Sequence, residues 1–243
     1  MSGTGVEVRH ASDTNEHFTP PVAVEPARDV LGSIDLDPAS CSIANRVIRA
    51  TRIFTKADNG LGRPWSGRVW LNCPGGYCDA DGHEVHRATK KRKPCTVTGS
   101  CGLPPGHAHT GVTSAQKRWW FKLADEYAIG NVDAAVWLGF SVESLQTTQS
   151  GARPRGPDGQ PLPVPLDFPL CIPRERIAYV RSGSTLARVP QVDLFGVEDL
   201  LGEGGDSPPH SSYLVFLPPR VGTDAAIARF KVVFEVALGK VKL

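Results

Sequence analysis

The chain has 243 residues, of which 40% are hydrophobic and 21% are charged, and its formal net charge is +2. This is the composition of a globular protein with one large domain, or with one domain that carries an insertion. No apolar run approaches the ~20 residues that span a bilayer, and the N-terminus lacks the basic-then-apolar order of a signal peptide. A cytoplasmic protein without a membrane segment is therefore expected, and any binding of nucleic acid has to come from local basic patches.

The first third of the chain alternates short extended and helical patterns. Two prolines at residues 20–21 open a helical pattern that ends at Gly32, because the amides of a first helical turn lack internal partners anyway. The elements expected after it are a strand at 33–40, a helix at 41–50, a strand at 51–55, a turn at 57–61 and a strand at 67–72.

The rest of the chain begins with an irregular stretch and then returns to regular patterns. Residues 73–112 hold four cysteines, four histidines and many glycines and prolines. In the helix expected at 114–130, Trp119, Leu123 and Tyr127 recur every four residues. The remaining elements expected are a strand at 132–140, a helix or extended turn at 141–149, a loop at 150–168, strands at 170–173, 176–180 and 211–218, and a closing helix at 224–238.

Strands that alternate with helices predict an α/β sheet covered by helices on both faces. Ligands of such sheets bind beyond the carboxyl ends of the strands. Asp37 and Asn72 both stand at predicted strand ends, so we expect them at one rim of the sheet. The glycine-rich motifs of dinucleotide-binding folds and of P-loop proteins are absent, which weakens both of those interpretations.

Three segments follow one another along the chain, namely FTPP (18–21), DLDPAS (35–40) and WLNCPGG (70–76). In this order they resemble the motifs of the phage-type DNA N-6-adenine-methyltransferases, which have a TPP segment, a D-[LV]-D-x-A-S strand end and an N-P-P motif. The resemblance continues through FTKADNGLGRPWSGRVWLN (54–72), LGFSVESLQTTQ (138–149), PLCIPRERI (169–177) and SPPHSSYLVFLP (207–218), and it covers most of the chain outside 77–112.

The resemblance implies one Rossmann-like, S-adenosylmethionine-dependent methyltransferase domain over residues 1–243, with a Cys/His-rich insertion at 75–112. It also implies double-stranded DNA as the partner and, for a phage-encoded enzyme, the host cytoplasm as its location. The reaction would transfer a methyl group to the exocyclic amine of adenine, and amino methylation of cytosine uses the same chemistry. The rival interpretation is a catalytically silent, zinc-containing DNA-binding protein on the same fold.

The turn after the third strand supplies the candidate catalytic residues Asn72, Cys73 and Pro74. The Asn72 side chain and the Cys73 main chain each offer a carbonyl oxygen that can accept an N–H bond of an amine and hold its nitrogen in line for transfer. The alternative is that Asn72 only caps the turn. Cys73 replaces the first proline of the family motif, and a catalytic thiol there is a more remote option.

The same turn has no aromatic residue to stack on a base taken out of the DNA helix. Gly75 stands where the family has an aromatic side chain, and stacking contributes about 1–3 kcal/mol per base. Tyr77 and Trp119 are the candidates for replacing that ring.

The candidate cofactor-binding residues precede this turn in the chain. Asp37, with Asp35 nearby, offers a carboxylate to the ammonium or hydroxyl groups of S-adenosylmethionine, or it belongs to an ordinary strand-terminating turn. By resemblance, Thr19 and Pro20 close over the methionine part, although by themselves they only begin a helix. Asp58 matches an acidic position that contacts the adenine part, and an Asx-turn explains it equally well.

The Cys/His-rich insertion favours a structural zinc ion, because soft ligands in an irregular segment can order a region with too few apolar residues to fold alone. The expected ligands are Cys78, Cys95, Cys101 and His107. Possible substitutes are His83, His86 and His109. The alternative is a disordered loop with free thiols.

A run of basic residues lies inside the insertion. It consists of Arg87, Lys90, Lys91, Arg92 and Lys93. Such a run can neutralise DNA phosphates, and its place beside the expected target site favours that role over a merely solvated basic face.

Overall fold

A mixed sheet of seven strands forms the centre of the molecule. The computed structural model describes residues 17–85, 101, 103–104, 106–181 and 211–243. In spatial order the strands are β12 (Gly239–Lys242), β9 (Leu170–Pro173), β11 (Ser212–Leu217), β8 (Val132–Phe140), β4 (Gly67–Leu71), β2 (Leu36–Asp37) and β3 (Arg52–Ile53). The strands from β8 to β3 are parallel, whereas β11, β9 and β12 each run antiparallel to their neighbours.

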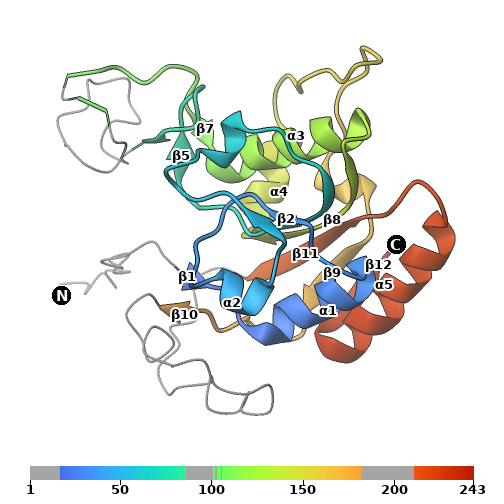
Figure 1. Ribbon diagram of the computed structural model, residues 1–243. Coiled ribbons are helices and arrows are strands. Elements are labelled where there is room, and N and C mark those ends of the chain that lie inside the picture. Colours follow the sequence, from blue (N-terminus) through green and yellow to red (C-terminus); the bar gives the residue numbers. More distant parts are fainter. Residues whose placement is uncertain (1–16, 86–100, 102, 105, 182–210) are drawn as a thin grey trace, which may run out of the picture.

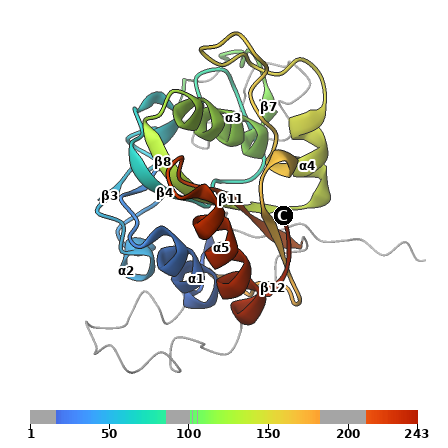
Figure 2. The same ribbon diagram turned by 90° about the vertical axis from the view of Figure 1, so that its right-hand side faces the viewer.

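Both faces of the sheet are apolar, because successive side chains of a strand point to opposite sides. In β8, Trp137 packs into one buried cluster and Val136 and Leu138 into the other. The helices α3 (Ala115–Ala128) and α4 (Val142–Gln149) cover the first face. The helices α1 (Pro21–Leu31), α2 (Asn45–Ile48) and α5 (Thr223–Ala237) cover the second, so three layers result (Figures 1 and 2).

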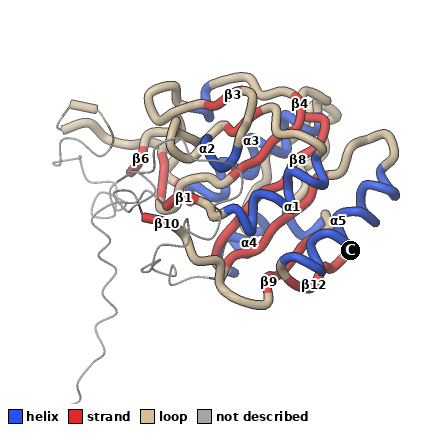
Figure 3. The backbone as a smooth tube through the Cα atoms, turned by 60° about the horizontal axis from the view of Figure 1, so that its bottom comes forward, coloured by secondary structure: helices blue, strands red, loops and turns tan. Residues whose placement is uncertain are grey.

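Two smaller sheets lie at the end of the main sheet where β4 terminates. In the first, β1 (His17–Phe18) pairs antiparallel with β10 (Val180–Arg181), as Figure 3 shows. The second consists of β5 (Tyr77–Cys78), β6 (Glu84–Val85) and β7 (Thr113–Ser114), with β5 in the middle and α3 alongside (Figure 1). The 3₁₀ turns η1 (Gly60–Gly62) and η3 (Pro165–Asp167) complete the elements.

The predicted α/β sheet with helices on both faces is confirmed, and the mixed sheet is compatible with a Rossmann-like arrangement. The strand expected at 132–140 has those bounds, whereas the helix expected at 41–50 shrinks to α2. The strand expected at 176–180 was mostly wrong, because only its last residue enters a strand. Strand β12 was not predicted, since its pairing with β9 is a long-range contact. None of the helices in the described ranges has the length and apolar character that a membrane span needs.

Candidate functional site

Asn72 follows the last residue of β4 and is held there by Thr19. The amide nitrogen Nδ2 of Asn72 donates a hydrogen bond to Thr19 Oγ1 at 2.8 Å, and Thr19 is only 4% exposed. Because Thr19 accepts from the amide nitrogen, the carbonyl oxygen Oδ1 of Asn72 faces away from Thr19 and can act as an acceptor. The structure therefore brings together two residues that the sequence assigned to the amine and to the cofactor.

The place of Thr19 follows from the elements on either side of it. Phe18 ends β1, which is fixed by its pairing with β10, and Pro20 is the N-cap of α1. Pro21 occupies the first helical position, where its missing N–H costs no hydrogen bond. Helix α1 packs on α5 and β8, so the short segment with Thr19 is anchored at both ends beside the end of β4.

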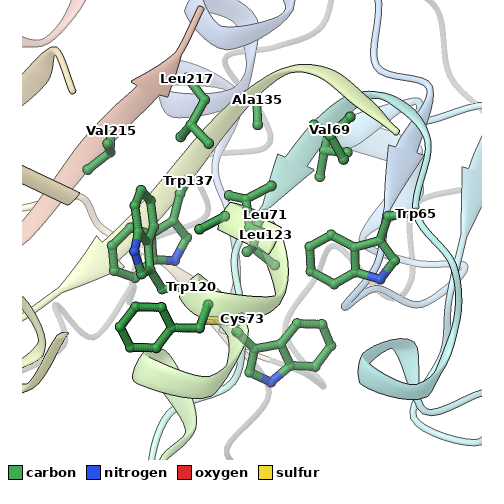
Figure 4. Packing of buried hydrophobic residues seen from close by; sticks show 14 of the residues in the cluster. Trp65, Val69, Leu71, Cys73, Trp120, Leu123, Ala135, Trp137, Val215 and Leu217 are labelled. Carbon is green, nitrogen blue, oxygen red and sulfur yellow. The ribbon is translucent and has the colours of Figure 1, made fainter. Parts of the chain in front are cut away.

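Cys73 points to the opposite face of the sheet from Asn72. Its side chain is 2% exposed and lies in the cluster under α3, beside Trp120 and Trp137 (Figure 4). Burial raises the pKa of the Cys73 thiol to about 12. A thiol with that pKa stays protonated at neutral pH, so the structure argues against Cys73 as a nucleophile. Pro74, the next residue, is exposed at the rim.

Gln116 links this turn to the end of β8. Its side chain is 3% exposed and stands near the start of α3. Gln116 Nε2 donates to Cys73 Sγ at 3.2 Å, and Gln116 Oε1 accepts from the backbone N–H of Phe140 at 3.4 Å. No local sequence pattern points to Gln116, because its role depends on two strand ends that meet only in the folded chain.

Asp37 is a buried carboxyl group at the end of β2. It is 1% exposed, and its Oδ1 accepts from the backbone N–H of Ala39 at 3.1 Å. None of the ion pairs found among the described residues includes Asp37. Burial raises the pKa of this carboxyl to about 7. Its strand neighbours β4 in parallel, so Asp37 lies at the rim that carries Asn72.

The carboxylates of Asp35 and Asp58 have structural partners. Asp35 Oδ2 accepts from the backbone N–H and from Nε of Arg68, at 2.8 and 2.9 Å, and this guanidinium holds the pKa of Asp35 below its ordinary value. Asp35 thus lies beside the start of β4, away from Asn72. Asp58 Oδ2 accepts from the backbone N–H and hydroxyl of Thr55, three residues earlier, so this carboxylate closes a local turn that differs from the Asx-turn considered from the sequence. We therefore leave both residues out of the candidate site.

The aromatic residue beside Gly75 is Phe140, which the sequence did not single out. A Cβ atom at Gly75 would lie 2.9 Å from Cζ of Phe140. Trp119, one of the two rings considered from the sequence, is 6% exposed and stacks on Trp65 in the core. Trp119 is therefore a packing residue, whereas the half-buried Phe140 lies at the rim.

A second candidate site is the group of Cys101, His107 and His109, whose ligand atoms lie close enough together to hold a metal ion. The two histidine Nε2 atoms are 2.9 Å apart, and Cys101 Sγ is 3.5 Å from His107 Nε2. Cys101 is 8% exposed and the His109 side chain only 2%, so the group is largely withdrawn from water.

The outer nitrogens of both histidines are fixed by acceptors. His107 Nδ1 lies 2.5 Å from the carbonyl oxygen of Pro104, and His109 Nδ1 lies 2.6 Å from Asp79 Oδ2. Because both partners are hydrogen-bond acceptors, each ring can donate through Nδ1–H, and Nε2 is the nitrogen that faces the group and is available to ligate a metal ion. Burial alone raises the pKa of Asp79, but hydrogen bonds from His109 and the backbone of His83 bring it below its ordinary value.

The predicted ligand set changes in one position. Cys78 is buried but lies outside the group, and burial raises the pKa of its thiol. His109, a substitute in the sequence analysis, takes its place. His83 instead contacts Asp79, with Nδ1 3.3 Å from Oδ2. The other candidates lie outside the described residues, namely Cys95, His86 and the basic run Arg87, Lys90, Lys91, Arg92 and Lys93.

The fold and the rim define the class of the protein as an α/β protein with a polar site at the carboxyl ends of its parallel strands, next to a Cys/His group that could hold a metal ion. Comparisons of the chain with protein-family models, with curated proteins and with solved structures found no match.

The burial of Asp37 predicts that Asp37→Asn stabilises the fold at high pH. A group whose pKa rises from 3.8 to about 7 on folding binds its proton more tightly in the folded state, so its contribution to stability falls as pH rises from about 4 to about 7. At pH 8 the free energy of unfolding of the variant should be roughly 2–4 kcal/mol higher than that of the parent protein. At pH 4 the two proteins should have similar free energies of unfolding.

Urea unfolding of the two proteins at pH 4 and pH 8 measures this difference. Asp133→Asn, at an exposed position of β8 on the other side of β4, is the matched control and should shift stability equally at both pH values. An equal shift at both pH values for Asp37→Asn would contradict the desolvated carboxyl.

Proposed function

We propose that the chain transfers a methyl group from S-adenosylmethionine to the exocyclic amine of adenine in double-stranded DNA. The observation that carries the proposal is the Asn72–Thr19 hydrogen bond of 2.8 Å at the end of β4. It fixes an amide with its carbonyl oxygen available beside a main-chain carbonyl, which is the pair of acceptors that an amine needs. The ordered resemblance of the surrounding segments to the phage-type DNA N-6-adenine-methyltransferases supports the same reaction.

The residues of the turn act on the amine and need no strong base. Asn72 Oδ1 and the main-chain oxygen of Cys73 accept the two N–H bonds, which localises the nitrogen lone pair and aims it along one line. As the new N–C bond forms, the bond between the cofactor's sulfur and its methyl carbon would break, and S-adenosylhomocysteine would leave. The nitrogen becomes positively charged, the same two oxygens stabilise that charge, and one proton then passes from the nitrogen to water. The protonated thiol of Cys73 takes no part, in keeping with its burial.

The residues at the rim fit the proposed cofactor. S-adenosylmethionine, when bound, supplies an electrophilic methyl group on a sulfonium centre, and it also carries an ammonium group and two ribose hydroxyls. Asp37 is a buried carboxylate that forms no ion pair among the described residues, so a cationic or hydroxyl donor would relieve its desolvation. Thr19 orients Asn72 through its hydrogen bond, and the closure of Thr19 and Pro20 over the methionine part, which the resemblance implies, stays a prediction.

The metal that suits the Cys/His group best is zinc. Zn–S bonds of about 2.3 Å and Zn–N bonds of about 2.0–2.1 Å place sulfur and nitrogen ligands of a tetrahedral site about 3.5 Å apart and two nitrogens about 3.3 Å apart. The S–N distance of 3.5 Å fits, and the N–N distance of 2.9 Å is slightly shorter. A metal ion between the two Nε2 atoms would be held by both rings at once. Cys95 is the proposed fourth ligand.

The insertion is also the proposed DNA-binding element. Its small sheet begins at Tyr77, five residues after Asn72, and the basic residues Arg87 to Lys93 belong to the segment between Val85 and Cys101. Cations placed there can neutralise phosphates on either side of the target base. The second candidate function is methylation of the cytosine amine, which uses the same two acceptors. The identity of the methylated base distinguishes the two functions.

Loss of the Asn72 acceptor is expected to abolish most of the transfer. Asn72→Ala should lower turnover by about two to three orders of magnitude, the usual effect of removing one preorganised hydrogen-bonding group from a reacting centre. Thr19→Val should lower it about tenfold, because the amide is then free to rotate. Thr19→Ser keeps the acceptor and should retain most of the activity.

The measurement is transfer of labelled methyl from saturating S-adenosylmethionine to unmethylated plasmid DNA. Wild-type turnover in Asn72→Ala, or no transfer by the wild-type protein, would overturn the proposed function. Equal losses in Thr19→Val and Thr19→Ser would show that Thr19 does not act through its hydroxyl.

The revised ligand set predicts which substitutions release the metal. The purified protein should carry about one zinc ion per chain, because closed four-ligand sites are tight. Cys101→Ser and His109→Ala should bring the zinc content close to zero, while Cys78→Ser should keep it, since Cys78 lies outside the group. Elemental analysis of protein purified without chelator gives the content. A protein without zinc, or one that loses zinc with Cys78→Ser and keeps it with His109→Ala, would refute this ligand set.

A further inference from the structure

Phe140 projects from the same face of the sheet as Asn72. Leu71 of β4 is in register with Trp137 of β8, so Asn72 is level with Leu138. Side chains two residues apart on a strand share a face, and therefore Phe140 lies on the face of Asn72, about 7 Å further along β8. Both strands are parallel and end at the same rim, so Phe140 belongs to the rim that carries Asn72.

The ring of Phe140 packs on the turn that follows Asn72. A Cβ atom at Gly75 would come within 2.9 Å of its Cζ atom, a distance that real side chains essentially never show. Glycine is therefore required at this position if the ring keeps its place. The turn itself carries no aromatic side chain from Asn72 to Gly76, and β8 brings a ring to its surface instead.

The backbone around Phe140 is firmly held. Its N–H donates to the buried Gln116, which also contacts Cys73, and its carbonyl oxygen accepts from the Ser144 hydroxyl at 2.7 Å. The next residue, Ser141, has φ 65° and ψ 140°, a conformation that is strained for a residue with a side chain. Strain of this kind persists where the surrounding structure fixes it, and it concentrates at binding and catalytic sites.

We propose that Phe140 is the residue on which the target base stacks while Asn72 holds its amine. A purine is flat and aromatic, and a ring that is held beside two amine acceptors offers it a face to stack on. Trp119 does not compete for this role, because it is buried against Trp65. The inference rests on the proposed function and adds the residue that recognises the base.

Replacement of Phe140 tests this role through DNA kinetics. Phe140→Leu keeps an apolar side chain but removes the flat ring, and it should lower kcat/KM for unmethylated plasmid DNA about ten- to a hundredfold. Phe140→Tyr restores a ring and should recover most of that loss. The affinity for S-adenosylmethionine, measured by calorimetry, should be the same in Phe140→Leu and in the wild-type protein.

Gly75→Ala provides an independent test, because the added methyl group displaces the ring. It should reproduce the defect in the wild-type background and add little to Phe140→Leu, as expected for two changes that act through one contact.

A failure of the inference about Phe140 can be distinguished from a failure of the proposed function. If the wild-type protein methylates DNA and Phe140→Leu does so with the same kcat/KM, the inference is overturned while the proposed function stands. A parallel loss of cofactor affinity in Phe140→Leu would mean a structural role and would also overturn it. No transfer by the wild-type protein overturns the proposed function and this inference together.

Discussion

The hydrogen bond between Asn72 and Thr19 joins residues 53 positions apart, and the candidate active site depends on it. An asparagine at a strand end is free to turn its amide either way, and only one orientation presents the carbonyl oxygen. Thr19 selects that orientation because it accepts from the amide nitrogen. The segment that carries Thr19 is in turn held by the β1–β10 pair and by the packing of α1 on the sheet.

Because side chains alternate along β4, the two residues that follow it point to opposite faces of the sheet. Asn72 faces the rim on the side of α1, while Cys73 enters the core under α3 and accepts from Gln116. A proline at residue 73 would fix the turn through its ring, which locks φ. The cysteine holds the turn by burial and by its side-chain contact with Gln116, so this turn is held in a different way from one that contains a proline at this position.

The metal group and the rim share a short stretch of chain. The turn after Asn72 leads directly into β5, and β7 leads directly into α3, where Gln116 stands. The backbone N–H of Ala115 donates to the Gly76 carbonyl at 3.0 Å, which ties the start of that helix to the turn. A metal ion that orders the insertion would therefore also stabilise the support of Cys73 and Phe140.

Local patterns were sufficient to place Asn72 and Asp37 at strand ends, because apolar strands and the polar residues after them are features of neighbouring residues. The role of Asp35 could not be predicted, since its partner Arg68 stands 33 positions away. The replacement of Cys78 by His109 in the ligand set depends on how the insertion folds, and the spacing of cysteines and histidines in the sequence does not predict it. From the sequence, Phe140 is only the last residue of a predicted strand. Its place beside Gly75 depends on the register of β4 with β8, which the local sequence does not show.

The central claim is that the rim methylates an exocyclic amine of a base, and the product identifies the acceptor atom. Unmethylated DNA incubated with the protein and S-adenosylmethionine can be digested to nucleosides and analysed by mass spectrometry. The account predicts N6-methyladenine. Finding N4-methylcytosine instead would keep the amine chemistry and contradict adenine as the target. The appearance of 5-methylcytosine, or of no methylated nucleoside at all, would contradict the central claim.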